Sequence, residues 1–143
     1  MSTSVLPHYP KISQSNLSLT SPTYIYIEVW GSAVSLDKNI LLENMNQPID
    51  FYTGEKLQPD DISVDHVIPW SFMYSDDIWN LVLTSKSHNS SKSNHIPSKE
   101  VIEQLNQRNK ELVETINNSK YKEELNIAIA HSYVDQFYLS MKL

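Results

Sequence analysis

The sequence predicts an α+β fold built from a β-hairpin, a short helix behind it, and flanking helices that pack against both. Apolar runs at 62–68 and 81–83 are rich in Ile, Leu and Val and have the length of short strands. The segment 69–80 between them carries proline, serine and aspartate, which favour loops. Thr84 is a typical helix N-cap residue, and residues 85–92 can form a short helix after it.

Two polar residues, Asp65 and His66, interrupt the first apolar run. A core that takes in a carboxylate and an imidazole must supply partners for both, or leave them at an edge where they do chemistry. Asn89 falls in the second turn of the predicted helix, so its side chain can face back across the hairpin. The pattern therefore predicts that polar groups converge within this ββα unit.

The flanking sequence divides the chain into four parts. Residues 1–20, rich in Ser, Pro and Asn, are expected to form a loose lead-in, and residues 21–47 a helical segment. A strand over 24–30 competes with that helix because aromatic and β-branched residues dominate there; we favour the helix on its apolar period. Residues 48–97 hold the ββα core, and residues 98–143 a pair of helices.

The two carboxyl-terminal helices are expected to serve as a scaffold, with a partner-binding or dimer surface as the alternative. Ser98 is the predicted cap of the first helix, residues 117–119 break it, and one last helix runs from about residue 120 to near the end. Three aromatic residues of the long loop are predicted to lie in the core: Trp70, Phe72 and Trp79.

Length and composition narrow the class of protein. A chain of 143 residues is enough for one domain. No apolar run approaches the length of a membrane span and the amino end lacks a signal-peptide pattern, so we expect a cytoplasmic protein without a membrane partner. The absence of cysteine excludes disulfides and thiolate zinc sites.

The polar constellation resembles the HNH, or ββα-metal (His-Me finger), nuclease family over about residues 48–97. Asp65 and His66 match the family's Asp-His pair on the first strand. Asn80 matches the middle Asn, and Asn89 matches the final Asn or His on the helix. The chain is also similar to a bacterial HNH endonuclease subgroup and to the HNH domain of RNA-guided CRISPR nucleases, in the strings 65–72, 79–83 and 89–93.

The chemistry of phosphodiester hydrolysis suggests a role for each matched residue. The reaction needs an activated water and a cation, and carboxylate and amide oxygens suit Mg²⁺ or Mn²⁺. Asp65 and Asn89 are therefore the predicted metal ligands. An unperturbed imidazole titrates near pH ~6.5, which favours His66 as the general base. The resemblance implies that Asn80 holds the loop backbone that presents His66.

Several assignments stay open at this point. His88 competes with Asn89 for the ligand position because some family members use His there; we favour Asn89, because residues 89–92 follow the subgroup's Asn-x-x-Lys pattern. Lys92 and Lys86 are candidates to contact the scissile phosphate, on location alone. The alternative for Asp65 and His66 is a buried pair that only ties the loop down.

Many HNH proteins carry a Cys-x-x-Cys zinc knuckle before the Asp-His strand, and this chain has residues 51–55 in its place. We therefore expect no structural zinc. The packing of Phe51, Tyr52 and Leu57 must then hold the hairpin, and folding cannot depend on a metal ion.

The resemblance implies a metal-dependent endonuclease, with DNA as the expected substrate, from a restriction, phage-defence, phage or mobile-element system. The formal net charge of −6 repels a polyanion, although residues 85–99 contain three lysines and no acidic residue. We therefore expect tight binding to require a separate recognition domain or chain. The alternatives are a catalytically decayed ββα module that binds nucleic acid or protein, and a toxin-type nuclease neutralised by an immunity protein.

Overall fold

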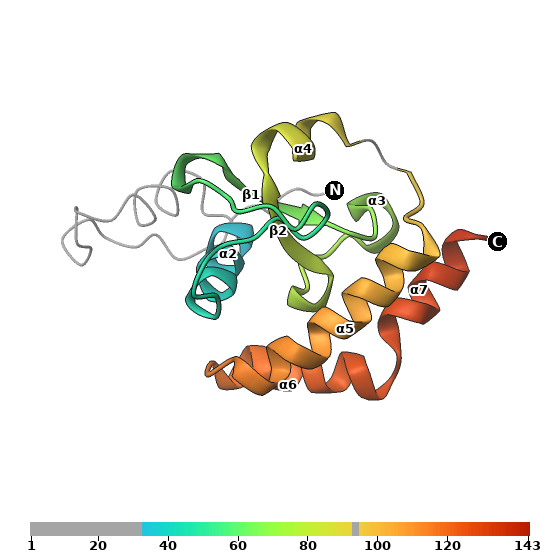
Figure 1. Cartoon of the computed structure of the whole chain (residues 1–143). Coiled ribbons are helices and arrows are strands. Elements are labelled where there is room, and N and C mark those ends of the chain that lie inside the picture. Colours follow the sequence, from blue (N-terminus) through green and yellow to red (C-terminus); the bar gives the residue numbers. More distant parts are fainter. Residues whose placement is uncertain (1–32, 93–94) are drawn as a thin grey trace, which may run out of the picture.

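The computed structural model describes residues 33–92 and 95–143; the lead-in and the first part of the predicted helical segment 21–47 lie outside these residues. Helices surround a two-stranded antiparallel sheet (Figure 1), which confirms the predicted α+β class. The elements are α2 (Ala33–Glu43), η3 (Pro59–Asp61), β1 (Ile62–His66), α3 (Trp70–Met73), η4 (Ile78–Asn80), β2 (Leu81–Ser85), α4 (Lys86–Ser91), α5 (Lys99–Thr115), α6 (Ser119–Ala130) and α7 (Tyr133–Met141).

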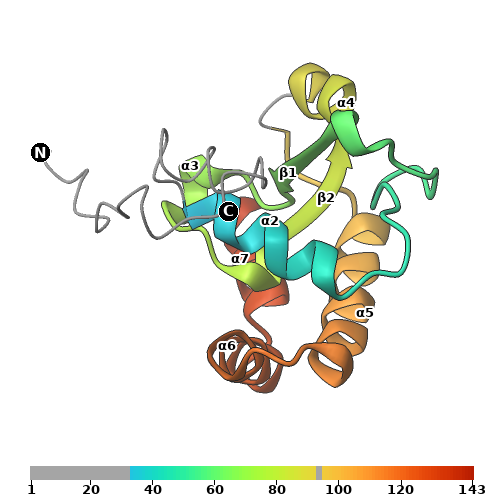
Figure 2. The same cartoon turned by 90° about the vertical axis from the view of Figure 1, so that its left-hand side faces the viewer.

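The hairpin and the short helix form close to where the sequence places them, although β1 ends at His66, two residues before the end of the apolar run. In the antiparallel register, Asp65 lies opposite Val82 and His66 opposite Leu81. The first four residues of β2 are buried, because α2 and α4 both contact the strands. Figures 1 and 2 show α4 at one end of the molecule and α6 at the other, with the hairpin between them.

The core lies beneath the loop that joins the two strands. Ile68, Ile78 and Trp79 are almost completely buried, and η4 contacts α5 and α6. Burial of one large apolar side chain stabilises a fold by about 1.5–3 kcal/mol, so this cluster fixes both ends of the loop. None of the helices in the described part of the chain is long and apolar enough to cross a membrane.

The prediction for the aromatic residues of the loop is wrong at two positions. Trp79 is 2% exposed, but Trp70 and Phe72 are 49% and 45% exposed. Residues Val67, Ile68 and Ile78 fill the core beneath the loop instead, and the single turn of α3 leaves its two aromatic rings outside.

Two helix boundaries also differ from the prediction. The last helix is interrupted at Ser132, which has a left-handed backbone (φ 52°) and lets α7 turn so that Phe137 packs against Trp79. Strand β2 runs one residue further than expected, and Ser85 rather than Thr84 caps α4 by accepting a hydrogen bond from the His88 N–H at 3.0 Å. The predicted cap of α5 at Ser98 is confirmed.

Candidate active site

The carboxylate of Asp65 lies in a buried position between two donors. Its Oδ2 accepts hydrogen bonds from the Tyr52 hydroxyl and from the Lys92 ammonium, both at 2.5 Å. Burial first, and then the charge of Asp65, raise the pKa of Tyr52 far above its ordinary value, so the hydroxyl stays protonated and donates. The buried charge expected to need compensation is therefore paired with a cation and a hydroxyl.

Lys92 uses all of its donors inside the protein. Besides Asp65, the ammonium donates to the Tyr52 hydroxyl oxygen at 3.1 Å and to the His66 carbonyl oxygen at 2.8 Å. A lysine ammonium has three N–H donors, so all three are engaged. The phosphate-binding roles of Lys92 and of the exposed Lys86 stay predictions, and in this structure Lys92 acts as the counter-ion of Asp65.

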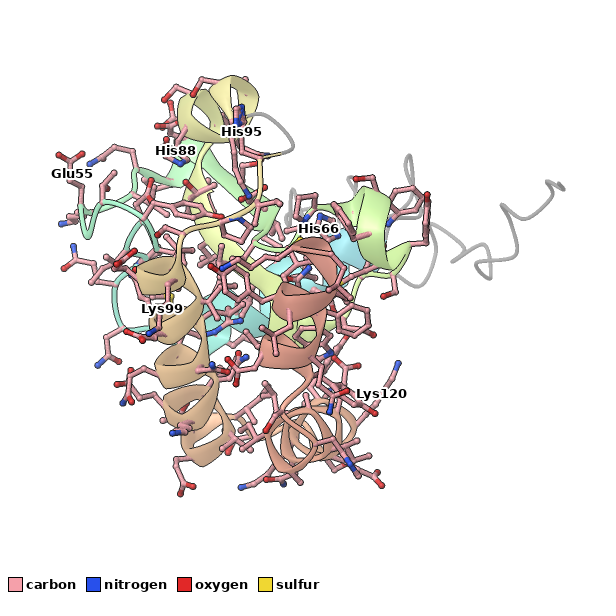
Figure 3. All side chains as sticks on the ribbon, turned by 90° about the vertical axis from the view of Figure 1, so that its right-hand side faces the viewer. Glu55, His66, His88, His95, Lys99 and Lys120 are labelled. Atoms are coloured by element: carbon pink, nitrogen blue, oxygen red, sulfur yellow. The ribbon has the colours of Figure 1, made fainter. Side chains whose placement is uncertain are left out.

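Asn89 reaches back from α4 to β1, as its place in the second turn predicted. Its Nδ2 donates to the Ser63 hydroxyl at 2.7 Å and to the Val64 carbonyl at 3.3 Å. Its Oδ1 has no hydrogen-bond partner among the described residues. His88, the alternative, stacks its ring on Tyr52 with centroids 4.7 Å apart. In Figure 3, His88 lies on the side of the molecule that carries Glu55, and His66 lies toward α3 and α7.

The oxygen atoms of Asp65 and Asn89 suit a hard divalent cation. Within residues 33–92 and 95–143, Asp65 Oδ1 is also without a hydrogen-bond partner. The same part of the chain contains no cluster of three or more His, Cys, Asp or Glu side chains that could hold a metal ion. Mg²⁺ needs only one or two protein oxygens, because it keeps several of its waters. The donor set thus fits Mg²⁺ or Mn²⁺.

His66 follows Asp65 but has a different environment. Its side chain is 20% exposed, and its Nε2 lies 2.7 Å from Oδ1 of Asp76. The other ring nitrogen, Nδ1, has no hydrogen-bond partner in the described structure. No pattern in the sequence distinguishes Asp76, which lies among serine and aspartate residues typical of a loop.

Asn80 is completely buried and holds the backbone just after His66. Its Oδ1 accepts from the Ile68 N–H at 2.8 Å, and its Nδ2 donates to the Ile68 carbonyl at 2.9 Å. Its own carbonyl accepts from the Val67 N–H at 3.0 Å. From α5, Asn109 donates to the Trp79 carbonyl at 2.8 Å. This geometry suits the positioning role predicted for Asn80.

A buried carboxylate that sequence reasoning missed, Asp50, ties the hairpin to the turn before it. Asp50 accepts the Tyr52 N–H at 2.8 Å, the Thr84 hydroxyl at 3.0 Å and the Ser85 N–H at 3.1 Å. Burial raises the pKa of Asp50, but these hydrogen bonds outweigh burial and hold the pKa below its ordinary value. Gly54 closes the turn with φ +76°. Asp50 therefore fastens the turn at residues 51–54 to the end of β2.

The hairpin and the helix behind it form a ββα unit with polar groups between its elements. Residues 50–98 match the model of the HNH endonuclease family, so this segment is similar to an HNH endonuclease domain. Among curated relatives, the chain is similar to the CRISPR-associated endonuclease Cas9 of Streptococcus mutans serotype c, with 44% identity over 59 residues. It is also similar to the CRISPR-associated endonuclease Cas9 of Listeria innocua serovar 6a, with 39% identity over 56 residues.

These matches cover only a small part of each relative. The first spans 39% of this chain and 4% of the relative, and the second 37% and 4%. The comparison therefore concerns the nuclease domain alone.

Proposed function

We propose that this protein is a metal-dependent endonuclease that hydrolyses phosphodiester bonds in DNA. The observation that carries the proposal is the set of three atoms without hydrogen-bond partners in the described structure, Asp65 Oδ1, Asn89 Oδ1 and His66 Nδ1. They belong to β1 and to α4, which contacts β1. Two of them are oxygen ligands suited to Mg²⁺ or Mn²⁺, and the third is a nitrogen that accepts a proton when neutral.

In this mechanism His66 takes a proton from a water molecule, and the oxygen of that water forms a new bond to phosphorus. The bond from phosphorus to the 3′ oxygen breaks, and the leaving oxygen takes a proton from solvent. The bound ion would supply electrostatic stabilisation to the phosphate and the leaving oxygen. Asn80 keeps the loop after His66 in place through its two hydrogen bonds to Ile68.

Substrate binding is proposed to depend on a separate DNA-recognition domain or chain. The net charge of −6 opposes association with a polyanion, and Lys92 spends its charge on Asp65. The named relatives are CRISPR-associated endonucleases far longer than the matched segment. On the basis of this similarity we also propose a role in restriction, phage defence or a mobile element.

The test is cleavage of supercoiled plasmid by the purified full chain in Mg²⁺, in Mn²⁺ and in EDTA. We expect conversion to nicked or linear DNA in either metal ion and none in EDTA. The assay covers a range of salt concentrations, because low salt strengthens contacts between lysine and phosphate but also the repulsion between an acidic protein and DNA. A folded protein that leaves the plasmid intact with both ions and at every salt concentration would contradict the proposal.

A second candidate is a catalytically decayed ββα module that binds nucleic acid or a protein partner. One observation favours it, because Lys92 already supplies the positive charge that a metal ion would bring to Asp65. Titration of Mn²⁺ into the protein separates the two functions. Binding of Mn²⁺ at the site would favour the nuclease. Absence of Mn²⁺ binding in a protein that still binds DNA would favour the decayed module.

A further inference from the structure

We infer that Asp76 is a positioning residue that holds the His66 imidazole through Nε2 and leaves Nδ1 to face the reacting water. This inference rests on the proposed function and names a residue that neither the sequence pattern nor the similarity to known nucleases singled out. It starts from a single contact, the 2.7 Å separation between His66 Nε2 and Asp76 Oδ1.

The chemistry of the two groups sets the direction of the hydrogen bond. An ionised carboxylate has only acceptors, and a neutral imidazole has one N–H donor and one acceptor nitrogen. A short contact with Asp76 therefore places the imidazole proton on Nε2. Nδ1 is then the lone-pair nitrogen, and it is the ring atom without a partner in the described structure. The ring is thus held in one tautomer and one orientation, with a free acceptor.

The segment that carries Asp76 is itself fixed on both sides. Before it, Tyr74 has a left-handed backbone (φ 54°) and donates its N–H to the Trp70 carbonyl at 2.7 Å. After it, the Ile78 N–H donates to Oε2 of Glu124 on α6 at 2.6 Å. The carboxyl-terminal helices therefore support the active-site loop as well as the core, and a fixed Asp76 can orient a ring that is partly exposed.

The neighbouring Asp77 provides a matched control. It belongs to the same loop and carries the same charge, but its carboxylate accepts from the Ser75 hydroxyl at 2.8 Å instead of contacting His66. Replacing either aspartate with asparagine removes one negative charge beside the site. Only the change at position 76 alters the direct contact with the imidazole.

The experiment compares Asp76→Ala and Asp76→Asn with Asp77→Asn in the full chain. Plasmid cleavage gives kcat and KM, thermal unfolding reports the fold, and NMR of ¹⁵N-histidine-labelled protein reports the Hε2 proton of His66. We expect both changes at Asp76 to lower kcat by about 10- to 100-fold with little change in KM or melting temperature. We also expect a slowly exchanging Hε2 signal in the wild type and in Asp77→Asn, and its loss in Asp76→Ala.

Two results would overturn the inference: an unchanged kcat in Asp76→Ala, or an equal loss of kcat in Asp77→Asn, which would make the effect one of loop charge. If the wild-type protein cleaves nothing, the proposed function fails by itself. The NMR signal still decides the contact in that case, because persistence of the Hε2 signal in Asp76→Ala would refute the positioning role independently of activity.

Discussion

Asp65 and His66 are neighbours on β1, yet their surroundings have opposite character. The Asp65 side chain is 11% exposed and faces a hydroxyl and an ammonium group, whereas the His66 side chain is 20% exposed and faces a carboxylate. Each of the two side chains therefore has its own set of partners, although the residues are adjacent in the chain. We call these the acid half, Asp65 with Tyr52 and Lys92, and the base half, His66 with Asp76.

The two halves are expected to differ in what they contribute: the acid half to stability and ion binding, and the base half to the rate of cleavage. The acid half is already balanced by Lys92 without any metal ion, so the domain can fold before an ion arrives. The base half has a free ring nitrogen and partial access to solvent, which a general base requires. Loss of the base should therefore affect rate alone, and loss of balance in the acid half should affect stability and ion binding.

The largest expected effect is the loss of cleavage rate when His66 of the base half is replaced. His66→Ala should lower the cleavage rate by roughly 10²- to 10⁴-fold, the usual contribution of a general base, while the melting temperature changes little. Steady-state cleavage of plasmid measures this, with His95→Ala, an exposed histidine, as the control. Activity that survives His66→Ala nearly intact would remove His66 from the mechanism.

The next largest effect is expected at Asn80, a buried residue that holds the loop after His66. Asn80→Ala removes two hydrogen bonds and leaves the Ile68 N–H and carbonyl without partners, which should cost roughly 2–4 kcal/mol of unfolding free energy. Urea denaturation measures the loss, and Asn126→Ala on the exposed face of α6 is the control. An unchanged unfolding midpoint would show that Asn80 does not fix the loop.

Replacing Lys92 in the acid half should have a smaller effect on the free energy of unfolding, and this effect should depend on the metal ion. Lys92→Met leaves Asp65 without its counter-ion and should cost about 1–3 kcal/mol. Because Mn²⁺ can then take the place of the ammonium, the ion should raise the melting temperature of Lys92→Met by more than that of the wild type. Lys86→Met, at an exposed lysine, is the control. Equal ion effects in wild type and Lys92→Met would argue against a cation site at Asp65.

A third buried carboxylate, Asp37 on α2, differs from Asp50 because its hydrogen bonding does not outweigh the effect of burial on its pKa. Burial raises its pKa from 3.8 to about 6, although a hydrogen bond from Tyr121 lowers it. Between about pH 4 and 6 the folded state holds a proton that the unfolded state has lost, so the contribution of Asp37 to stability falls as pH rises through this window.

Asp37→Asn removes that dependence. The variant should be more stable than the wild type by about 1–2 kcal/mol at pH 8, within the roughly 3 kcal/mol that the full shift represents, and equal to it near pH 4. Urea denaturation across this range gives the difference, with the exposed Asp60→Asn as the control. A difference that does not grow with pH would mean that Asp37 ionises freely in the folded protein.

The parts of this fold that the sequence predicts are those that local patterns determine. The two apolar runs specify β1 and β2, and the cap at Ser98 follows from its own hydroxyl and the Val101 N–H three residues on. The resemblance to HNH nucleases adds Asn80 and Asn89, whose side chains do reach the hairpin.

The missed features depend on contacts between distant residues. The bond from Thr84 to Asp50 spans 34 positions, and that from the Ile78 N–H to Glu124 spans 46. Nothing in the residues near Asp76 distinguishes it from Asp77, because only the path of the loop decides which of them meets His66. The exposure of Trp70 was also mispredicted. A single turn of helix is too short for its apolar pattern to show which side chains are buried.

The most direct test of the two halves combines calorimetric titration of Mn²⁺ with plasmid cleavage for His66→Ala and Asn89→Ala. We expect His66→Ala to bind Mn²⁺ as the wild type does while losing cleavage, and Asn89→Ala to lose both. Loss of ion binding in His66→Ala, or wild-type ion binding in Asn89→Ala, would contradict the assignment of the metal ion to Asp65 and Asn89 and of the general base to His66.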